Sequence, residues 1–151
     1  MKPVSHEQAA QADIVFLAVN WSRIPAALDG LGPWNGRIVV DANNPIEAPT
    51  FQPFDLGDKS SSEVVAQLLP GARLVKAFNH LAPTLLEADQ KAKGGDRVLF
   101  YAGKDASAKA AVAALMERLG FAGIDLGGPA EGHLAQFPGG PLSALNLELH
   151  R

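Results

Sequence analysis

The chain contains no cysteine, and this absence removes several classes of chemistry at once. Disulfide bonds, thiolate catalysis and metal sites with cysteine ligands are all excluded. The four histidines are His6, His80, His133 and His150. They have none of the spacings that are typical of metal ligands, so the sequence predicts no metal site.

The sequence also lacks clusters of basic residues and long apolar segments. Lys and Arg number 13 against 16 Asp and Glu, and no basic cluster appears, which argues against a nucleic-acid surface. No apolar run approaches the ~18 residues that a membrane-spanning helix needs. The first residues are polar, unlike a signal peptide. We therefore expect a soluble, cytoplasmic protein that binds neither nucleic acid nor a membrane.

Two glycine motifs that bind nucleotides are absent as well. The sequence has no G-x-G-x-x-G and no G-x-x-x-x-G-K-[ST]. A glycine cluster does occur at 30–36, but it follows a predicted helix and precedes a predicted strand. A dinucleotide fingerprint has the reverse order, since it follows a strand and opens a helix. We interpret the cluster as a turn.

Apolar strands alternate with helical patterns along most of the 151 residues, a length typical of one domain. The expected strands are 13–19, 37–41, 72–80, 96–103 and 121–126. The expected helices are 5–12, 22–31, 60–69, 105–119 and 142–149, with 82–93 helical or irregular. This alternation predicts the α/β class, with a Rossmann-like parallel sheet and helices on both faces. We expect a single domain over 1–151.

Local signals predict where several helices begin. Ser22 is a candidate N-cap, and Ser60 with Glu63 forms the spacing of a capping box. Asp105 is a third candidate N-cap. The residues at 46–59 contain prolines and aspartates with scattered aromatics, which indicates a long loop.

Three successive expected strands end in polar residues, at Asn20-Trp21, at Asn43-Asn44-Pro45 and at Asn79-His80. The carboxyl ends of parallel strands share one edge of the sheet, and ligands bind at that edge in open α/β folds. Amide side chains and an indole gathered there form a crevice suited to a planar polar ring. The alternative is a set of ordinary turns, in which Asn and Pro are common.

Four residues near these ends have two interpretations each. Trp21 either stacks on a bound ring or covers the first turn of its own helix. His80 is either a proton donor to a reduced acceptor or a half-buried loop histidine. Asp41 and Lys76 either pair with each other or lie at solvent-facing strand ends.

Four segments together resemble the deazaflavin-dependent NADP reductase family, a group of predicted dinucleotide-binding oxidoreductases. They are also similar to the cytosolic domain of membrane ferric reductases. The segments are Asp13–Trp21, Ile38–Pro45, Val75–Asn79 and Gly139–Leu142. Their order and spacing match, and the resemblance covers essentially the whole chain.

The resemblance implies a Rossmann-type domain that transfers hydride between NADP and a deazaflavin or flavin-like acceptor. It also implies which residues bind the cofactor: Val19, Trp21, Asn43, Asn44, Pro45, Ala77, Phe78 and Asn79. The last three of these would approach the nicotinamide carboxamide. Such a protein mainly positions two rings face to face, and we assign no catalytic residue.

The sequence departs from the family pattern in three places. Family members begin with a strand, a G-x-G-x-x-G turn and a helix, so the resemblance describes an N-terminally truncated member. Without that turn the pyrophosphate loses its backbone donors. Asn20 and His80 stand where the family often has Pro and Thr.

Two functions therefore remain open. One is an NADP-dependent oxidoreductase, including an inactive or partial form of one. The alternative is a non-catalytic α/β interaction domain that has lost cofactor binding.

The segment from Ile14 to Val19 would form the edge of such a sheet. It is apolar throughout and carries no charge to discourage pairing with another strand. We expect a homo-oligomer that pairs through this edge; the alternative is that the working protein is longer.

Overall fold

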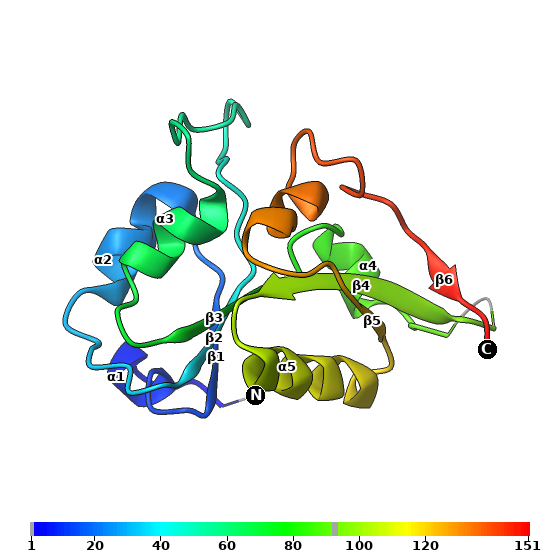
Figure 1. The fold of residues 1–151 in the computed structure, drawn as a ribbon, viewed down its shortest axis with the longest axis horizontal. Helices are drawn as coiled ribbons and strands as arrows, with labels where there is room; N and C mark the ends of the chain where they lie inside the picture. The colour runs from blue at the N-terminus through cyan, green and yellow to red at the C-terminus, as the bar shows by residue number, and fades with distance from the viewer. Residues whose placement is uncertain (1, 92–93) are drawn as a thin grey trace.

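The computed structural model describes residues 2–91 and 94–151, and it shows one sheet with helices on both faces (Figure 1). The strands are β1 Ile14–Leu17, β2 Ile38–Asp41, β3 Arg73–Ala77, β4 Asp96–Gly103, β5 Ala122–Asp125 and β6 Glu148–Leu149. The α-helices are α1 His6–Ala9, α2 Ile24–Leu28, α3 Ser61–Gln67, α4 Pro83–Glu87 and α5 Ala106–Arg118. Two 3-10 helices are η1 Trp21–Arg23 and η2 Ala130–Ala135.

The order of strands in the sheet is β1-β2-β3-β4-β5, and β6 pairs with β4. β1, β2 and β3 are mutually parallel, so their carboxyl ends lie at one edge. The expected Rossmann-like α/β architecture is confirmed, with a sheet that is mainly parallel and in which β4 runs antiparallel to β3. A parallel pair needs a crossover over one face of the sheet, usually an α-helix. The five-residue α4 makes no such crossover, and the chain returns beside β3 instead.

Two hydrophobic clusters sandwich the parallel strands. Val39 packs toward α2 and α3, where it meets Val65, whereas Val40 packs toward Val112 of α5. Neighbouring residues of a strand point to opposite faces, so β2 is buried on both sides. Figure 1 shows α2 and α3 over one face and α5 over the other. The ends of β1, β2 and β3 are thus held between packed layers.

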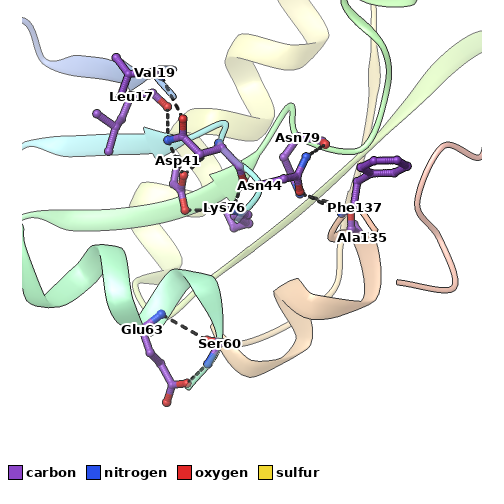
Figure 2. Close-up of polar contacts among 11 residues, drawn as sticks. Leu17, Val19, Asp41, Asn44, Ser60, Glu63, Lys76, Asn79, Ala135 and Phe137 are labelled. Carbon is purple, nitrogen blue, oxygen red and sulfur yellow. Dashed lines mark hydrogen bonds and ion pairs between the residues drawn. The ribbon is translucent and has the colours of Figure 1, made fainter. Parts of the chain in front are cut away.

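Two of the three predicted helix starts are confirmed. The Ser60 hydroxyl accepts from the Glu63 N–H at 3.2 Å, and the Glu63 carboxylate accepts from the Ser60 N–H at 2.7 Å (Figure 2). Asp105 accepts from the N–H of Ala108 at 2.7 Å. The N-cap role of Ser22 is wrong, since this residue lies inside η1. Its N–H and hydroxyl both donate to Glu47 instead, each at 3.0 Å.

The helix expected at 142–149 is also wrong. The chain there forms turns and then β6, which pairs with the first residues of β4. Leu145, Leu147 and Leu149 are spaced by two, which is the period of a strand. In the expected segment 82–93, α4 accounts for the helical part, and residues 92 and 93 lie outside the described residues.

Candidate functional site

An open crevice lies where β1 and β2 end. Of the three polar strand ends expected to form it, these two line it, whereas the end of β3 and the Trp21 indole do not. Its volume is about 320 Å³. The lining residues are Ala18, Val19, Asn20, Ala42, Asn43, Asn44 and Ile46. Ala18 and Ala42 keep the crevice open because their side chains are small. The remaining lining includes three amides, so the crevice combines space with hydrogen-bonding groups.

Asn43 ties the ends of the two strands together. Its side-chain oxygen accepts from the Val19 N–H at 2.9 Å, and its side-chain nitrogen donates to the Leu17 carbonyl at 2.9 Å. The same nitrogen donates to Asp41 Oδ1 at 2.9 Å, and the Asn43 N–H donates to that oxygen at 3.0 Å. Both amide hydrogens of the side chain are therefore used within the protein. Asn43 holds the crevice in shape.

A buried ion pair lies directly beneath Asn43. Lys76 Nζ lies 3.0 Å from Asp41 Oδ2, and both side chains are almost completely excluded from solvent. Lys76 also donates to the Asn43 carbonyl. Of the two interpretations offered by the sequence, pairing between Asp41 and Lys76 is the one that the structure shows.

Asn44 connects the end of β2 to two distant segments (Figure 2). Its side-chain nitrogen donates to the Asn79 carbonyl at 2.7 Å, and its oxygen accepts from Asn79 Nδ2 at 3.1 Å. The same oxygen accepts from the N–H of Phe137 at 2.9 Å. Asn79 Nδ2 also donates to the Ala135 carbonyl at 3.2 Å. Two asparagines thus join β2, β3 and the segment that follows η2.

The backbone bends sharply between β3 and Asn79. Phe78 has a φ of 63°, a left-handed conformation that a bulky side chain rarely adopts. Its ring packs edge-on against Phe16 and Phe121, with centroid distances of 5.2 Å and 6.1 Å. This packing holds the strained residue in place. The bend brings the backbone carbonyl and the side-chain nitrogen of Asn79 within hydrogen-bond distance of the Asn44 side chain.

A second cavity of about 420 Å³ adjoins the crevice. Asn44 and Ile46 line both spaces. The other lining residues of the second cavity are Phe51, Asn79, His80, Leu81, Ala82, Pro83, Phe137 and Ala144. Most of these side chains are apolar, so the second cavity suits a flat, largely hydrophobic ring with a polar edge.

His80 is more deeply buried than either interpretation of the sequence assumed. It is 3% exposed, its ring lies 5.0 Å from that of Phe100, and neither ring nitrogen has a hydrogen-bond partner among the described residues. Burial lowers its pKa from 6.5 to about 4, because the charged imidazolium is penalised away from water. His80 is therefore neutral at pH 7 and is a poor source of protons there.

The eight residues implied to bind the cofactor have different positions. Val19, Asn43 and Asn44 line the crevice, and Asn79 lines the second cavity. Trp21, Pro45 and Ala77 are buried, and Trp21 belongs to the cluster beneath α2 and α3, 6.5 Å from the Phe54 ring. The burial of Trp21 in this cluster favours the interpretation that it covers the first turn of its helix, but stacking on a bound ring stays a prediction. Phe78 packs between Phe16 and Phe121. That these eight residues bind a cofactor stays a prediction.

Sequence reasoning missed three contributors to this region. Ile46 lines both cavities, although it lies in the segment interpreted only as a loop. Ala135 and Phe137 supply backbone partners to the asparagines. The resemblance at Gly139–Leu142 was the nearest signal, since it placed a family motif just beyond those residues.

Residues 2–91 and 94–151 contain neither a metal-binding cluster nor a helix able to span a membrane. No group of three or more His, Asp or Glu side chains is placed to hold a metal ion. None of the helices in this part of the chain has both the length and the apolar character that crossing a membrane requires.

Comparison with protein families gives a match at residues 1–45. The matching family is described as NADP oxidoreductase, coenzyme F420-dependent. These residues contain β1, β2 and the asparagine pair, so the match includes the lining of the crevice apart from Ile46.

Among curated proteins, metalloreductase STEAP3 of Rattus norvegicus is 30% identical over 124 residues. This match covers 80% of the chain and 24% of the relative. Metalloreductase STEAP2 of Mus musculus is 25% identical over 123 residues, covering 81% of the chain and 24% of the relative. The chain thus spans about a quarter of the length of these relatives.

Solved structures extend the likeness along the chain. The hypothetical protein SMa0349 from Sinorhizobium meliloti is 46% identical with a TM-score of 0.91, over 96% of this chain and 71% of that one. A candidate F420-dependent NADP reductase from Arthrobacter sp. FB24 is 30% identical with a TM-score of 0.72, and the match covers 98% of this chain and 74% of that one. A pyrroline-5-carboxylate reductase from Coxiella burnetii, at 15% identity and a TM-score of 0.59 over 91% and 47%, shares the fold. These likenesses confirm the Rossmann-like α/β fold.

Proposed function

Because this chain belongs to the family of coenzyme F420-dependent NADP oxidoreductases, we propose that it binds the nicotinamide of NADP in the crevice at the ends of β1 and β2. The observation that carries this proposal is the construction of the crevice. Small side chains leave its centre open, and two of its three amides, Asn43 and Asn44, are held by bonds to neighbouring strands. A rigid polar rim at a strand edge is the usual setting for a nicotinamide in open α/β folds.

The residues present fit the nicotinamide end of the cofactor. Ligand pockets span about 300–1,000 Å³, and the crevice, at about 320 Å³, is large enough for one ring system but small for a whole dinucleotide. Asn20 is exposed and its side chain has no partner among the described residues, so its amide is available to a carboxamide. Asn43 donates to no ligand, because it is buried and both of its amide hydrogens are bonded within the protein.

The reaction we propose is hydride transfer with a deazaflavin or flavin-like acceptor. NADP supplies the hydride-carrying ring when it is bound. Asn44 and Ile46 form a wall common to the crevice and the second cavity, which supports a site for the acceptor ring beside the nicotinamide. The apolar side chains of the second cavity exclude water from that ring. Catalysis would then rest on orientation of two rings.

Calorimetry with the purified chain tests the binding step. NADPH should bind, and the reduced nicotinamide mononucleotide should bind with similar affinity, because the sequence has no glycine turn for the pyrophosphate. Ala18→Trp should abolish binding of both by filling the crevice. Ala114→Trp is the matched control, since Ala114 is exposed on α5. Equal binding by the two variants would contradict the proposed site.

Loss of NADPH absorbance tests the transfer step. Coenzyme F420, a flavin mononucleotide and a chelated ferric ion would be compared as acceptors; the last is included because two relatives are named metalloreductases. We expect turnover with one of the first two. Binding of NADPH without turnover in all three would favour the alternative of a form that has lost catalysis.

We further propose that two copies of the chain associate through β1. Among the described residues β1 pairs only with β2, and its other edge has no partner. Phe16 is 45% exposed, and Ile14 to Leu17 contain no charge. Antiparallel pairing of two copies would place apolar residues opposite apolar residues. A bare edge of this kind is a ready template for another strand.

Light scattering during gel filtration tests the association. We expect a dimer that dissociates on dilution, and Phe16→Lys should yield monomers at every concentration. Leu119→Lys changes an equally exposed leucine at the end of α5 and should leave the dimer intact. A wild-type monomer at high concentration would contradict this proposal and would leave the nicotinamide site unaffected.

A further inference from the structure

The proposed function does not use the buried ion pair between Asp41 and Lys76; neither residue lines the crevice, but both bond to Asn43, which does. Asp41 is 0% exposed and Lys76 is 3% exposed, so neither charge is placed to contact a ligand in the crevice. The pair nevertheless lies directly behind it. Among the described residues, every hydrogen bond of the two side chains is made to Asn43 or within the pair.

The bonds of the pair fix the backbone that borders the crevice. Asp41 Oδ1 accepts hydrogen bonds from the backbone N–H and the side-chain nitrogen of Asn43, at 3.0 Å and 2.9 Å. Lys76 Nζ donates to the Asn43 carbonyl. The side-chain amide of Asn43, held in this orientation, accepts a hydrogen bond from the Val19 N–H and donates one to the Leu17 carbonyl. One lysine on β3 thus determines the geometry of the ends of β2 and β1.

Lys76 has little freedom to move away from this arrangement. A Cβ atom placed on Gly132 of η2 would lie 3.5 Å from Lys76 Cγ and 3.4 Å from the hydroxyl oxygen of Ser62 on α3. It would also lie 3.6 Å from the methyl group of Ala102 on β4. The aliphatic part of Lys76 is therefore enclosed between η2, α3 and β4, and the ammonium group is directed at Asp41 and Asn43.

Stability does not account for such a pair. Taking two charges out of water has a large desolvation penalty, and well-packed apolar residues in place of a buried pair are often neutral or stabilising. What apolar residues would not provide is a partner for the N–H and carbonyl of Asn43. If the backbone N–H and carbonyl of Asn43 had no partners, its side chain would no longer hold the Val19 N–H in a single conformation.

We propose that Lys76 is a positioning residue for the nicotinamide site, acting through Asp41 and Asn43 on the backbone of Val19. This inference rests on the proposed function in so far as it names the ligand. Lys76 preorganises the edge of the crevice before the cofactor arrives, and no bond from Lys76 to the cofactor is required. Pre-formed geometry raises affinity because less ordering remains to be done on binding.

The test compares variants of the pair. The double variant Asp41→Leu with Lys76→Met removes both charges and both partners of Asn43 and leaves no unpaired buried ion, so it should fold. We expect its affinity for NADPH to fall at least tenfold. The control is Lys109→Met, which breaks a half-buried ion pair between α5 and β5, away from the crevice, with a distance of 2.9 Å. The affinity of that variant should equal the wild-type value, and wild-type affinity in the double variant would overturn the inference.

Hydrogen exchange supplies a readout that does not need the cofactor. In the double variant the backbone amides of Val19 and Asn43 should exchange at least tenfold faster, while those of Val39 and Val75 in the core stay protected. If the wild type fails to bind NADPH, the proposed function fails, but local loss of protection would still support positioning by Lys76. Equal loss of protection in the core, or none at Val19 and Asn43, would overturn it.

Discussion

Replacing His80 by leucine should remove a dependence of stability on pH. The imidazole is 3% exposed, contacts Phe100, and has no hydrogen-bond partner among the described residues. Leucine is apolar, of similar size, and has no group to protonate. Because buried unpartnered nitrogens are destabilising, the leucine variant should be at least as stable as the wild type near neutral pH.

The sign of the effect follows from the pKa of His80, which burial lowers from 6.5 to about 4 in the folded protein. Between these values the unfolded chain binds a proton that the folded protein does not, so stability falls as the pH falls. At pH values well above 6.5, the pKa of His80 in the unfolded chain, neither state binds this proton, so His80 causes no loss of stability there. By linkage the loss reaches about 2 kcal/mol at about pH 5, and about 3 kcal/mol once the pH is below the folded pKa.

Urea unfolding of the wild type and His80→Leu, at about pH 7.5 and about pH 5, measures this term. Other groups also titrate on acidification, including Glu63 and Asp105, whose pKa values are lowered by hydrogen bonds at their helix caps. They are common to both proteins and cancel in the difference. We expect the advantage of the leucine variant to grow by about 2 kcal/mol between the two pH values.

The reasoning about His80 would be refuted by a constant difference between the two proteins. That result would mean that the imidazole accepts a proton as readily in the folded protein as in the unfolded chain, and hence that its ring is reached by water. A growing difference together with a less stable variant at neutral pH would instead show that leucine fits the site poorly.

Two further predictions concern hydrogen bonds. Asn44→Ala should lower the free energy of unfolding by about 2–3 kcal/mol, because it leaves groups of Asn79 and Phe137 unpaired. Asn20→Ala, which removes no bond within the described residues, should leave that free energy unchanged, and equal effects would contradict the role of Asn44. Ser60→Ala should cost about 1 kcal/mol by removing the cap of α3. Thermal unfolding of the Ser60→Ala variant measures this loss of stability, and an unchanged melting temperature would mean that the cap contributes little.

Features that depend on neighbours in the chain were predictable from the sequence. Asp105 caps α5, and Ser60 with Glu63 closes a capping box, because each bond spans three residues. The fourth strand was expected at 96–103 and occupies those residues. The meeting of the strand ends was also predictable, since parallel strands place their carboxyl ends at one edge.

Features that depend on distant contacts were not predictable. Asn44 bonds to Phe137, which lies 93 positions later, and no local pattern marks that partner. The burial of His80 depends on Phe100 of β4, so the choice between its interpretations needed the strand order. β4 runs antiparallel to β3, and no local pattern in the sequence marks that direction. The leucines from Leu142 onward were expected to form a helix, but Glu148–Leu149 pair with β4 as a strand.

By itself the sequence determined the class of fold, the positions of the central strands and the edge at which their polar residues gather. These follow from periodicity and from short-range bonds, which any chain with this order of residues would favour. The tertiary structure alone decided the roles of those polar residues. Asn43 and Asn44 are alike in the sequence, but one is saturated above a buried ion pair and the other joins three segments. A side chain's role depends on which groups remain unpaired around it, and packing decides that.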